Sequence, residues 1–477
     1  MPSAYPLVEE IFMAPDAPWC FEAFAPCPYS FFLDSGMDAR KLGRYSFMGS
    51  DPFLVLKSRG DSVTLIKDGK EENKRGNPFD ILGEILKTYT LNGSRSGLPF
   101  TGGAVGYFSY DLGHFIERLP SRAVDDVNLP ECYLAFYDAA VAFDHLENKT
   151  YVISTGFPEL TEQKRLQRAA ERLQELKSRV LFAAPPPEIL QSASDKGALK
   201  ANFTHEAYLG AVAKAREYIC AGDIFQVNLS QRFDTAVSLP PYELYKKLRK
   251  INPAPFANYF NFDDVSIVGA SPERFLKLHG DWVETRPIKG TKPRGKTPAE
   301  DKALGESLFH SVKDRAENTM IVDLERNDIG RVCRYGTVKV TEHAILETYP
   351  TVFHLTSTVV GQLQKGKDRI DLLKATFPGG SITGAPKVRA MEIIDELEPT
   401  RRGVYTGSLG YLSFSGDMDL NIVIRTIVVK NGRAYFQVGG AIVYDSEPES
   451  EYIETLDKGR ALMKALNLVP PDNVELT

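Results

Sequence analysis

Two pairs of carboxylates stand out among the residues that could do chemistry. Asp314 and Glu317 lie three positions apart in HSVKDRAENTMIVDLERND, and Glu451 and Glu454 have the same spacing in DSEPESEYIETLDKGRAL. On a helix, residues three apart share a face, so two such helices facing each other would form an oxygen-only site that suits Mg²⁺. Acidic pairs of this kind more often form a solvated helix face. The metal hypothesis therefore depends on the residues around them.

Glycine-rich turns precede both a predicted helix and the second acidic pair. In FPGGSITGAPKVRAMEII the glycines allow close backbone approach, and the free amides of a helix beginning near Ala385 can bind an anion. QVGGAIVYDSEPE repeats the arrangement with Gly439 and Gly440. These turns indicate a site for a small anionic ligand.

Two basic residues complete the pattern. Lys458 follows Glu454 by one helical turn, and Arg425 is the only charge in the apolar segment NIVIRTIVV. A buried arginine needs an anionic partner, whereas an arginine on an edge strand can reach solvent, and the residues leave both readings open. Together these features predict a pocket for a small dicarboxylate bound through one magnesium ion.

The elements that must position these residues divide the chain into two halves. Residues 161–180 form a charged helical pattern with an apolar stripe, and three consecutive prolines follow it. We therefore expect a strand-rich N-terminal domain over 1–183, a linker over 184–200 and a catalytic domain over 201–477.

The catalytic half contains strands and helices that do not alternate strictly, which favours an α+β fold over a doubly wound sheet. Thr204 is the expected N-cap of its first helix, which ends before Gly222. The expected strands are 223–233, 266–278, 281–288, 404–414, 420–429 and 434–444. The further expected helices are 299–328, 368–377, 385–396 and 449–465.

The composition excludes several classes of function. The formal net charge of −6 and the lack of a basic run argue against nucleic acid and anionic membranes as partners. No apolar stretch is long enough to span a membrane, and the first residues do not resemble a secretory signal. The five cysteines show no CxxC spacing, which argues against zinc sites and disulfides. A cytoplasmic location is expected.

Long segments resemble the chorismate-utilising enzymes, a family that includes anthranilate, aminodeoxychorismate, isochorismate and salicylate synthases. The matching segments are GRYSFMGSDPF, TGGAVGYFSYDL, GDIFQVNLSQRF, GASPERFL, RPIKGTKPRG, ENTMIVDLERNDIGRV, FPGGSITGAPKVRAM, GVYTGSLGYLS and DSEPESEYIETLDK. The resemblance implies large antiparallel sheets that form a sandwich-like core with helices packed outside.

The resemblance also implies roles for individual residues. Glu317 and Glu454 match the family's Mg²⁺ ligands, with Asp314 and Glu451 as companions that hold ligand waters. The groups that match its catalytic residues are Lys289, Glu273 (the acid for the departing C4 hydroxyl) and His354. The residues that match its substrate cradle are Ser381, Thr291, Tyr405, Arg425, Gly439, Gly440 and Lys458.

Two positions distinguish the branches of the family. Isochorismate and salicylate synthases have a lysine base where this chain has Gln226, and a neutral amide cannot take the proton from water. Anthranilate synthases read PIAGT where this chain reads PIKGT, whereas aminodeoxychorismate synthases have the lysine. Lys289 can add to the substrate as a nucleophile if its pKa is lowered. Alternatively, it pairs with an acidic residue or with the substrate.

The resemblance thus implies an enzyme that aminates chorismate at C4, with anthranilate synthase component I as the main alternative. The chain has no Gly-x-Cys-x-Gly nucleophile turn, so ammonia is expected from a glutamine amidotransferase subunit, in a heterodimer, or from solution.

A third alternative is a non-catalytic relative that senses an amino acid, because the family's N-terminal half can bind tryptophan. PYSFFLDSG, RYSF and NPAPF resemble elements of that pocket. The candidate residues are Asp34, Ser35, Arg44, Tyr45, Asn252, Pro253, Ala254, Pro255 and Phe256. The intact acidic pairs and Lys289 argue against a dead enzyme.

Overall fold

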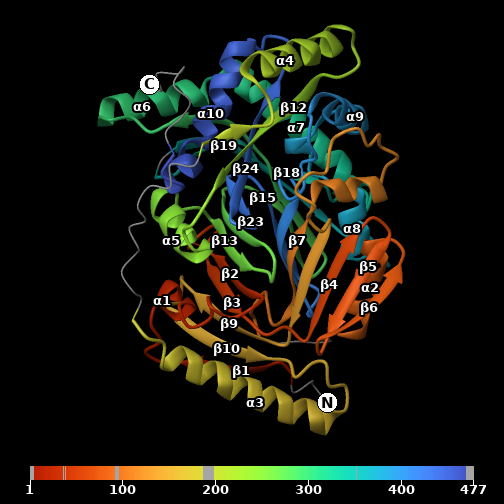
Figure 1. Cartoon of the computed structure of the whole chain (residues 1–477), viewed down its shortest axis with the longest axis vertical. Coiled ribbons are helices and arrows are strands. Elements are labelled where there is room, and N and C mark those ends of the chain that lie inside the picture. Colours follow the sequence, from red (N-terminus) through yellow and green to blue (C-terminus); the bar gives the residue numbers. More distant parts are fainter. Residues whose placement is uncertain are drawn as a thin grey trace.

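In a computed structural model, which describes residues 5–35, 37, 39–91, 96–185, 198–350 and 352–468, two antiparallel sheets lie face to face (Figure 1). The first sheet has twelve strands in the order β1 (Leu7–Ile11), β10 (Lys149–Ser154), β9 (Ala139–Asp144), β3 (Tyr45–Gly49), β2 (Ser30–Asp34), β13 (Phe256–Asn261), β14 (Ser266–Ser271), β23 (Thr426–Lys430), β24 (Arg433–Ile442), β12 (Gln226–Ala236) and β11 (Lys200–Ala201), with β20 (Gly384–Ala385) paired to β12.

Among the described residues, the second sheet also has twelve strands. Their order is β17 (Ile288–Pro293), β19 (Val352–Gln362), β16 (Trp282–Arg286), β15 (Arg274–His279), β22 (Met418–Ile422), β21 (Ser408–Ser413), β7 (Gly103–Phe108), β8 (Cys132–Tyr137), β4 (Leu54–Arg59), β5 (Ser62–Lys67) and β6 (Lys70–Arg75), with β18 (Lys339–Thr348) paired to β19. Each sheet joins a block of strands from the N-terminal half to a block from the C-terminal half, through the β2–β13 pair in the first sheet and the β7–β21 pair in the second. The expected linker lies mostly outside the described residues.

Helices cover the outer faces of the two sheets. They are α1 (Ala17–Phe21), α2 (Pro78–Thr88), α3 (Glu162–Leu181), α4 (His205–Cys220), α5 (Pro241–Ile251), α6 (Pro298–Phe309), α7 (Val312–Gly330), α8 (Arg369–Thr376), α9 (Lys387–Leu397) and α10 (Pro448–Ala465), together with the short 3₁₀ turns η1 (Tyr110–Phe115) and η2 (Gly380–Ile382). α3 lies along β1 and β10 at one end, and α4, α6 and α10 lie at the other (Figure 1). The α+β, sandwich-like prediction is confirmed. None of the described helices is long and apolar enough to cross a membrane.

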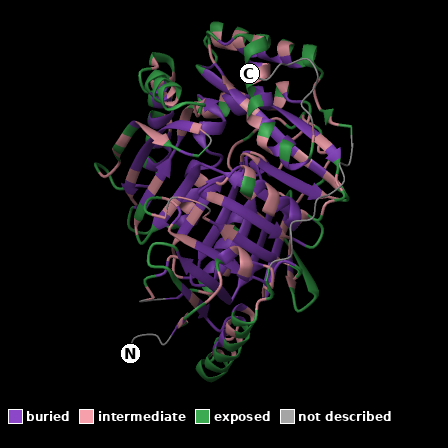
Figure 2. Cartoon of the chain, turned by 90° about the vertical axis from the view of Figure 1, so that its left-hand side faces the viewer, coloured by how far each residue is buried: buried purple, intermediate pink, exposed green. Residues whose placement is uncertain are grey.

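Strand alternation explains how each sheet is covered on both faces. In β8, Leu134 and Phe136 belong to an apolar cluster under the outer helices, whereas Tyr133 and Tyr137 belong to the cluster between the sheets. Successive side chains of a strand point to opposite faces, so one strand serves both clusters. The strands are accordingly buried along most of their length (Figure 2).

The N-cap predicted for α4 is confirmed. The Thr204 hydroxyl accepts a hydrogen bond from the Ala207 amide at 3.1 Å and begins α4 as predicted. The helix expected over 299–328 is wrong as a single element. α6 ends at Phe309, and α7 begins at Val312. The Ser311 hydroxyl caps α7 by accepting a hydrogen bond from the Asp314 amide at 3.2 Å.

The strand expected over 420–429 is also wrong as a single element. β22 and β23 belong to different sheets, and Arg425 lies between them with a φ of 51°. Positive φ is rare for a side chain with a β-carbon, so an apolar run alone does not predict it. Arg425 therefore lies where the chain crosses from one sheet to the other.

Candidate active site

Two of the predicted site residues lie at neighbouring crossings between the sheets. Glu273 follows β14 of the first sheet and precedes β15 of the second, while Arg425 separates β22 from β23. The Ile422 amide donates to the Glu273 carbonyl at 3.0 Å, and the Ala270 amide donates to the Arg425 carbonyl at 3.1 Å. The two crossings therefore run side by side, which brings both residues to the same region between the sheets.

Glu273 is a buried carboxyl group with a defined partner. It is 4% exposed, and the Ser381 hydroxyl donates a hydrogen bond to its Oε1 at 2.5 Å. Burial raises the pKa of Glu273 to about 7, although the Ser381 hydrogen bond and the charge of Lys289 act in the opposite direction. A carboxyl group with this pKa can hold a proton near neutral pH and deliver it to a leaving group.

Lys289 lies on β17 close to that carboxyl group. Burial lowers the pKa of Lys289, and the nearby Lys458 acts in the same direction, whereas Glu317, Glu273 and Glu454 oppose it. Lys289 forms no ion pair among the described residues. An amine held in this way has a larger neutral fraction than an exposed lysine, and the neutral form is the nucleophile.

The two acidic pairs lie against two glycines. A β-carbon on Gly440 would lie 3.1 Å from Glu451 Oε2 and 3.4 Å from Glu454 Oε1, and one on Gly290 would lie 3.1 Å from Asp314 Oδ1. Burial raises the pKa of Glu317, and the charge of Glu454 adds to the increase. The pairs from α7 and α10 therefore face the same space.

These carboxylates fit a cation that is only partly coordinated by protein. In the described ranges, no three or more acidic, histidine or cysteine side chains converge closely enough to hold a metal by themselves. Glu451 Oε2 is nevertheless buried and has no hydrogen-bond partner in the described part of the chain, while Oε1 accepts from the Ser446 hydroxyl at 2.6 Å. Mg²⁺ commonly binds one or two carboxylates and takes its remaining oxygens from water and substrate. The donor set suits that ion.

His354 lies on β19 opposite Thr291 of β17. Its Nδ1 lies 2.8 Å from the Thr291 hydroxyl, and its buried Nε2 has no hydrogen-bond partner among the residues that the structure describes. Burial and the nearby charge of Arg425 lower the pKa of His354 to about 3, so the ring is neutral at physiological pH. Thr291, predicted to contact substrate, thus orients the imidazole and leaves Nε2 available for a ligand.

Cationic groups surround the same space. Lys458 forms an ion pair with Glu454 at 2.6 Å and donates to the Gly439 carbonyl at 2.9 Å. Within the described part of the chain, Arg425 has no ion-pair partner, and burial lowers its pKa. A half-buried arginine without a carboxylate can bind an anionic substrate group. This supports the dicarboxylate prediction over the edge-strand alternative.

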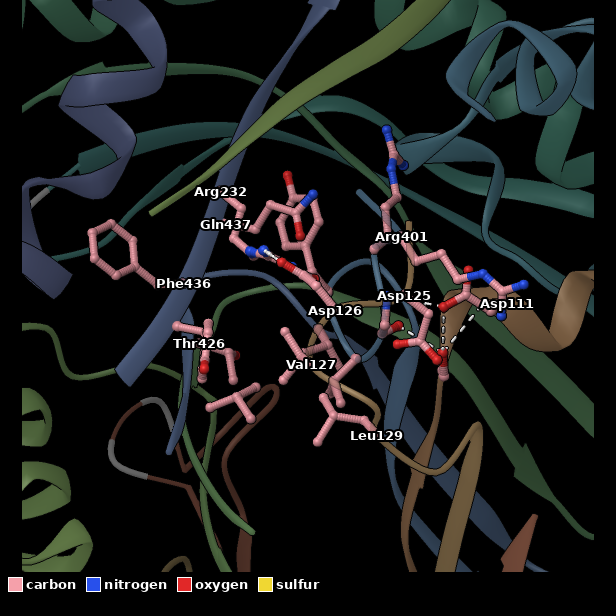
Figure 3. A pocket seen from close by; sticks show the side chains of 18 of the residues that line it. Asp111, Asp125, Asp126, Val127, Leu129, Arg232, Arg401, Thr426, Phe436 and Gln437 are labelled. Carbon is pink, nitrogen blue, oxygen red and sulfur yellow. Dashed lines mark hydrogen bonds and ion pairs between the residues drawn. The ribbon is translucent and has the colours of Figure 1, made fainter. Parts of the chain in front are cut away.

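A small cavity of about 50 Å³ is lined in part by Tyr405 and Arg402. Figure 3 shows Arg232, Asp126 and Asp111 on its wall. On its wall Arg232 forms two hydrogen bonds with Asp126, at 2.9 and 2.5 Å. Asp111 accepts from the Gly403 amide at 3.0 Å, and burial raises the pKa of this carboxyl to about 6. The charged groups of the wall are thus largely held by the protein itself.

A larger cavity of about 340 Å³ is lined by strands of both sheets. Six residues of the tryptophan pocket suggested by resemblance line it: Asp34, Ser35, Arg44, Tyr45, Pro255 and Phe256. Asn252, Pro253 and Ala254 are not among its lining residues. The Asp34 carboxylate already accepts from the Tyr245 hydroxyl at 2.7 Å, and Arg44 is paired with Asp144 at 2.8 Å.

Sequence reasoning missed several groups that hold the site together. The Gly380 amide donates to Glu325 at 3.1 Å, and the Asn228 amide group donates to the Ser381 carbonyl at 3.0 Å. A β-carbon on Gly380 would lie 2.7 Å from Leu324, so this glycine makes room for α7. Arg402 and Glu398 were also missed, because both lie beyond the helix expected over 385–396 and most of their hydrogen-bond partners are distant in sequence.

The buried carboxyl group of Glu273, the half-buried amine of Lys289 and the two acidic pairs thus lie around one region between the two sheets, an arrangement typical of an enzyme active site. The family model of chorismate binding enzymes matches residues 38–464, and the chain belongs to that family. It is 42% identical over 436 residues to aminodeoxychorismate synthase component 1 of Bacillus subtilis, covering 91% of each chain. It is 40% identical to anthranilate synthase component 1 of Cereibacter sphaeroides, covering 91% of this chain and 89% of the relative. The crystal structure of anthranilate synthase component I from Streptococcus pneumoniae superposes with a TM-score of 0.77 at 36% identity, covering 89% and 92% of the two chains.

Proposed function

We propose that this chorismate-utilising enzyme is the synthase component that converts chorismate and ammonia to 4-amino-4-deoxychorismate, on the route to para-aminobenzoate and folate. The observation that carries the proposal is the place of Lys289, whose amine lies among the charges of Glu273, Glu317 and Glu454. Relatives of both the aminodeoxychorismate and the anthranilate type match with similar identity, so overall similarity does not choose between them.

The residues of this chain support a route with a covalent step. The neutral amine of Lys289 adds at C2 of the ring, the double bonds shift, and the C4–oxygen bond breaks. Glu273 gives its proton to that departing hydroxyl, which leaves as water. Ammonia then adds at C4, the double bonds shift back, and the bond between Lys289 and C2 breaks. Proton loss from the new ammonium group completes 4-amino-4-deoxychorismate.

The remaining groups bind and orient the substrate. Arg425 and Tyr405 hold one carboxylate, while Lys458 and the backbone at Gly439 and Gly440 close the opposite side. Glu317 and Glu454 would hold Mg²⁺, with Asp314 and Glu451 binding its waters. When bound, the ion would neutralise the ring carboxylate and withdraw electrons from the diene.

Ammonia is proposed to come from a separate glutamine amidotransferase subunit. The relatives' designation as component 1 supports a partner component. A heterodimer of synthase and glutaminase subunits is therefore the expected assembly.

Product analysis tests the proposal. Purified protein is incubated with chorismate, Mg²⁺ and ammonium, and the products are separated and identified by mass spectrometry. We expect 4-amino-4-deoxychorismate, which retains the enolpyruvyl group. Anthranilate with an equal amount of pyruvate would instead assign the chain to the alternative branch. No conversion of chorismate would refute both assignments.

A further inference from the structure

A buried ion pair lies beneath the substrate cradle. The side chains of Arg402 and Glu398 are 2% and 1% exposed, and they are joined by Nη2 to Oε1 at 2.7 Å and Nε to Oε2 at 2.9 Å. Glu398 also accepts from the amide and the hydroxyl of Ser230, both at 2.8 Å. Burying two charges is costly unless their remaining hydrogen bonds are satisfied, and here the carboxylate is satisfied by four bonds.

The guanidinium group uses all five of its N–H donors. Beyond Glu398, its Nη1 donates to the Ile382 carbonyl at 3.0 Å and to the Thr406 hydroxyl at 3.3 Å, and its Nη2 donates to the Asn228 carbonyl at 2.8 Å. These three acceptors come from η2, from the segment before β21, and from β12. One rigid, planar group thus joins three segments that are distant in sequence.

Two of those segments carry a residue of the predicted site, and the third contacts one of these residues. Ile382 follows Ser381, the donor to Glu273; Thr406 follows Tyr405 and donates to its carbonyl at 2.6 Å. Asn228 donates to the Ser381 carbonyl at 3.0 Å. The guanidinium carbon also lies 5.8 Å from the centre of the Tyr405 ring. The contacts of Arg402 therefore end one residue away from the groups that hold the substrate and the acid.

We propose that Arg402, held by Glu398, is a positioning residue for the chemistry of this site, fixing Ser381 and Tyr405 at once relative to Glu273. The proposal rests on the proposed reaction of chorismate. Arg402 itself does not touch the substrate. It acts by keeping the Ser381 hydroxyl on the Glu273 carboxyl group and the Tyr405 ring against the substrate carboxylate.

The first test is Arg402→Lys, which keeps the positive charge beside Glu398 but offers only three donors from one point. We expect the KM for chorismate to rise and kcat to fall, with kcat/KM lower by about 100-fold, as small misplacements of catalytic groups commonly cause. The matched control is Arg172→Lys on α3, whose side chain is 13% exposed and 3.5 Å from the buried Asp138. We expect the control to keep wild-type KM and kcat even if its melting temperature falls as far.

The second readout is the pH profile, which a merely structural role would not move. Glu273 is faced by Ser381 from η2, by Lys289 from β17, by Lys458 from α10 and by the carboxyl of Glu325 from α7. Removing the Ser381 hydrogen bond raises the pKa of Glu273, so Ser381→Ala should move the high-pH limb of kcat to higher pH. Arg402→Lys should move that limb in the same direction, and the double variant should move it no further than Ser381→Ala alone.

Thr406→Val provides a milder change if Arg402→Lys does not fold. It removes the hydroxyl between Arg402 and the Tyr405 carbonyl while keeping the shape of the side chain, and KM for chorismate should rise by about threefold, the loss expected of one hydrogen bond. The positioning role would be overturned if folded Arg402→Lys shows wild-type kinetics and a wild-type pH limb. If Arg402→Lys is unfolded, the same result in Thr406→Val would overturn it. Absence of chorismate turnover in the wild type would instead overturn the proposed function.

Discussion

The Ser381 hydroxyl lies 2.5 Å from the Glu273 carboxylate, although the two residues are 108 positions apart in the chain. Burial raises the pKa of Glu273 to about 7, and Ser381 limits that increase. The pair therefore sets the pH range in which the acid holds its proton.

The first prediction concerns pH. Glu273 must be protonated to act as an acid, so kcat should fall as pH rises through about 7, the pKa of the buried carboxyl. Glu273→Gln should lose most activity at every pH, because an amide cannot donate that proton. Rate measurements from pH 5 to 9, roughly the range around this pKa, check the limb. A high-pH limb that persists in Glu273→Gln would assign it to another group.

The second prediction concerns the metal. Glu317→Gln and Glu454→Gln should each lower activity by about 100-fold or more, because each removes a charge from the proposed Mg²⁺ site. Chelator should inactivate the wild type, and added Mg²⁺ should restore it.

Controls for the metal come from the same two helices. Asp323→Asn on α7 and Asp457→Asn on α10 remove carboxylates that are 63% and 49% exposed and paired with arginines. Both should retain wild-type activity. Near-normal activity of Glu317→Gln or Glu454→Gln in chelator would show that the magnesium assignment is wrong.

The third prediction concerns Lys289. Incubating the wild type with chorismate and Mg²⁺ but without ammonia should leave a mass adduct on the peptide containing Lys289, because no ammonia is present to complete the reaction. Lys289→Ala should form no adduct and show a partial loss of activity, with some product aminated at C2, since ammonia can then attack there directly.

Lys292→Ala is the matched control for that experiment, because Lys292 lies on the same strand and contacts Ser307 on α6. It should form the adduct and retain activity. If the wild type forms no adduct and Lys289→Ala makes 4-amino-4-deoxychorismate at the wild-type rate, Lys289 is only a cation of the substrate pocket.

The fourth prediction concerns the source of nitrogen. The purified chain should use ammonium but not glutamine, because its sequence has no nucleophile-cysteine turn of an amidotransferase. Initial rates with each nitrogen donor check this. Glutamine-dependent activity from a rigorously pure single chain would contradict the expected division between two subunits.

The fifth prediction concerns the cavity of about 340 Å³. If tryptophan binds there, a concentration of 100 times its dissociation constant should stabilise the fold by about 2.7 kcal/mol and raise the melting temperature. Phe256→Ala, which alters the cavity wall, should weaken that shift, whereas Phe12→Ala, at a side chain 77% exposed, should not. No shift in the wild type at millimolar tryptophan would exclude this ligand.

The cavity of about 340 Å³ and Glu273 meet at the junction between β14 and β15. Arg274 lines the cavity and pairs with Asp419 at 2.9 Å, and it directly follows Glu273. The rate of chorismate conversion should therefore be measured with and without tryptophan, alongside the melting temperature.

The sequence by itself determined the residue types of the site and much of its local structure. The acidic pairs lie on helices, Thr204 caps α4, and the irregular order of strands and helices indicated an α+β fold, because these depend on contacts only a few residues apart. The lysine at position 289, which distinguishes the aminodeoxychorismate branch from the anthranilate branch, is likewise given by the sequence alone.

Only the tertiary structure decided which of these residues meet. Apolar periodicity gave one strand across Arg425, whereas the positive φ there lets the chain cross from one sheet to the other and lie beside the crossing at Glu273. The role of Arg402 was equally invisible, because its acceptors at Asn228, Ile382 and Thr406 come together only when the strands pair. Such groupings depend on contacts between distant segments, which neighbouring residues do not encode.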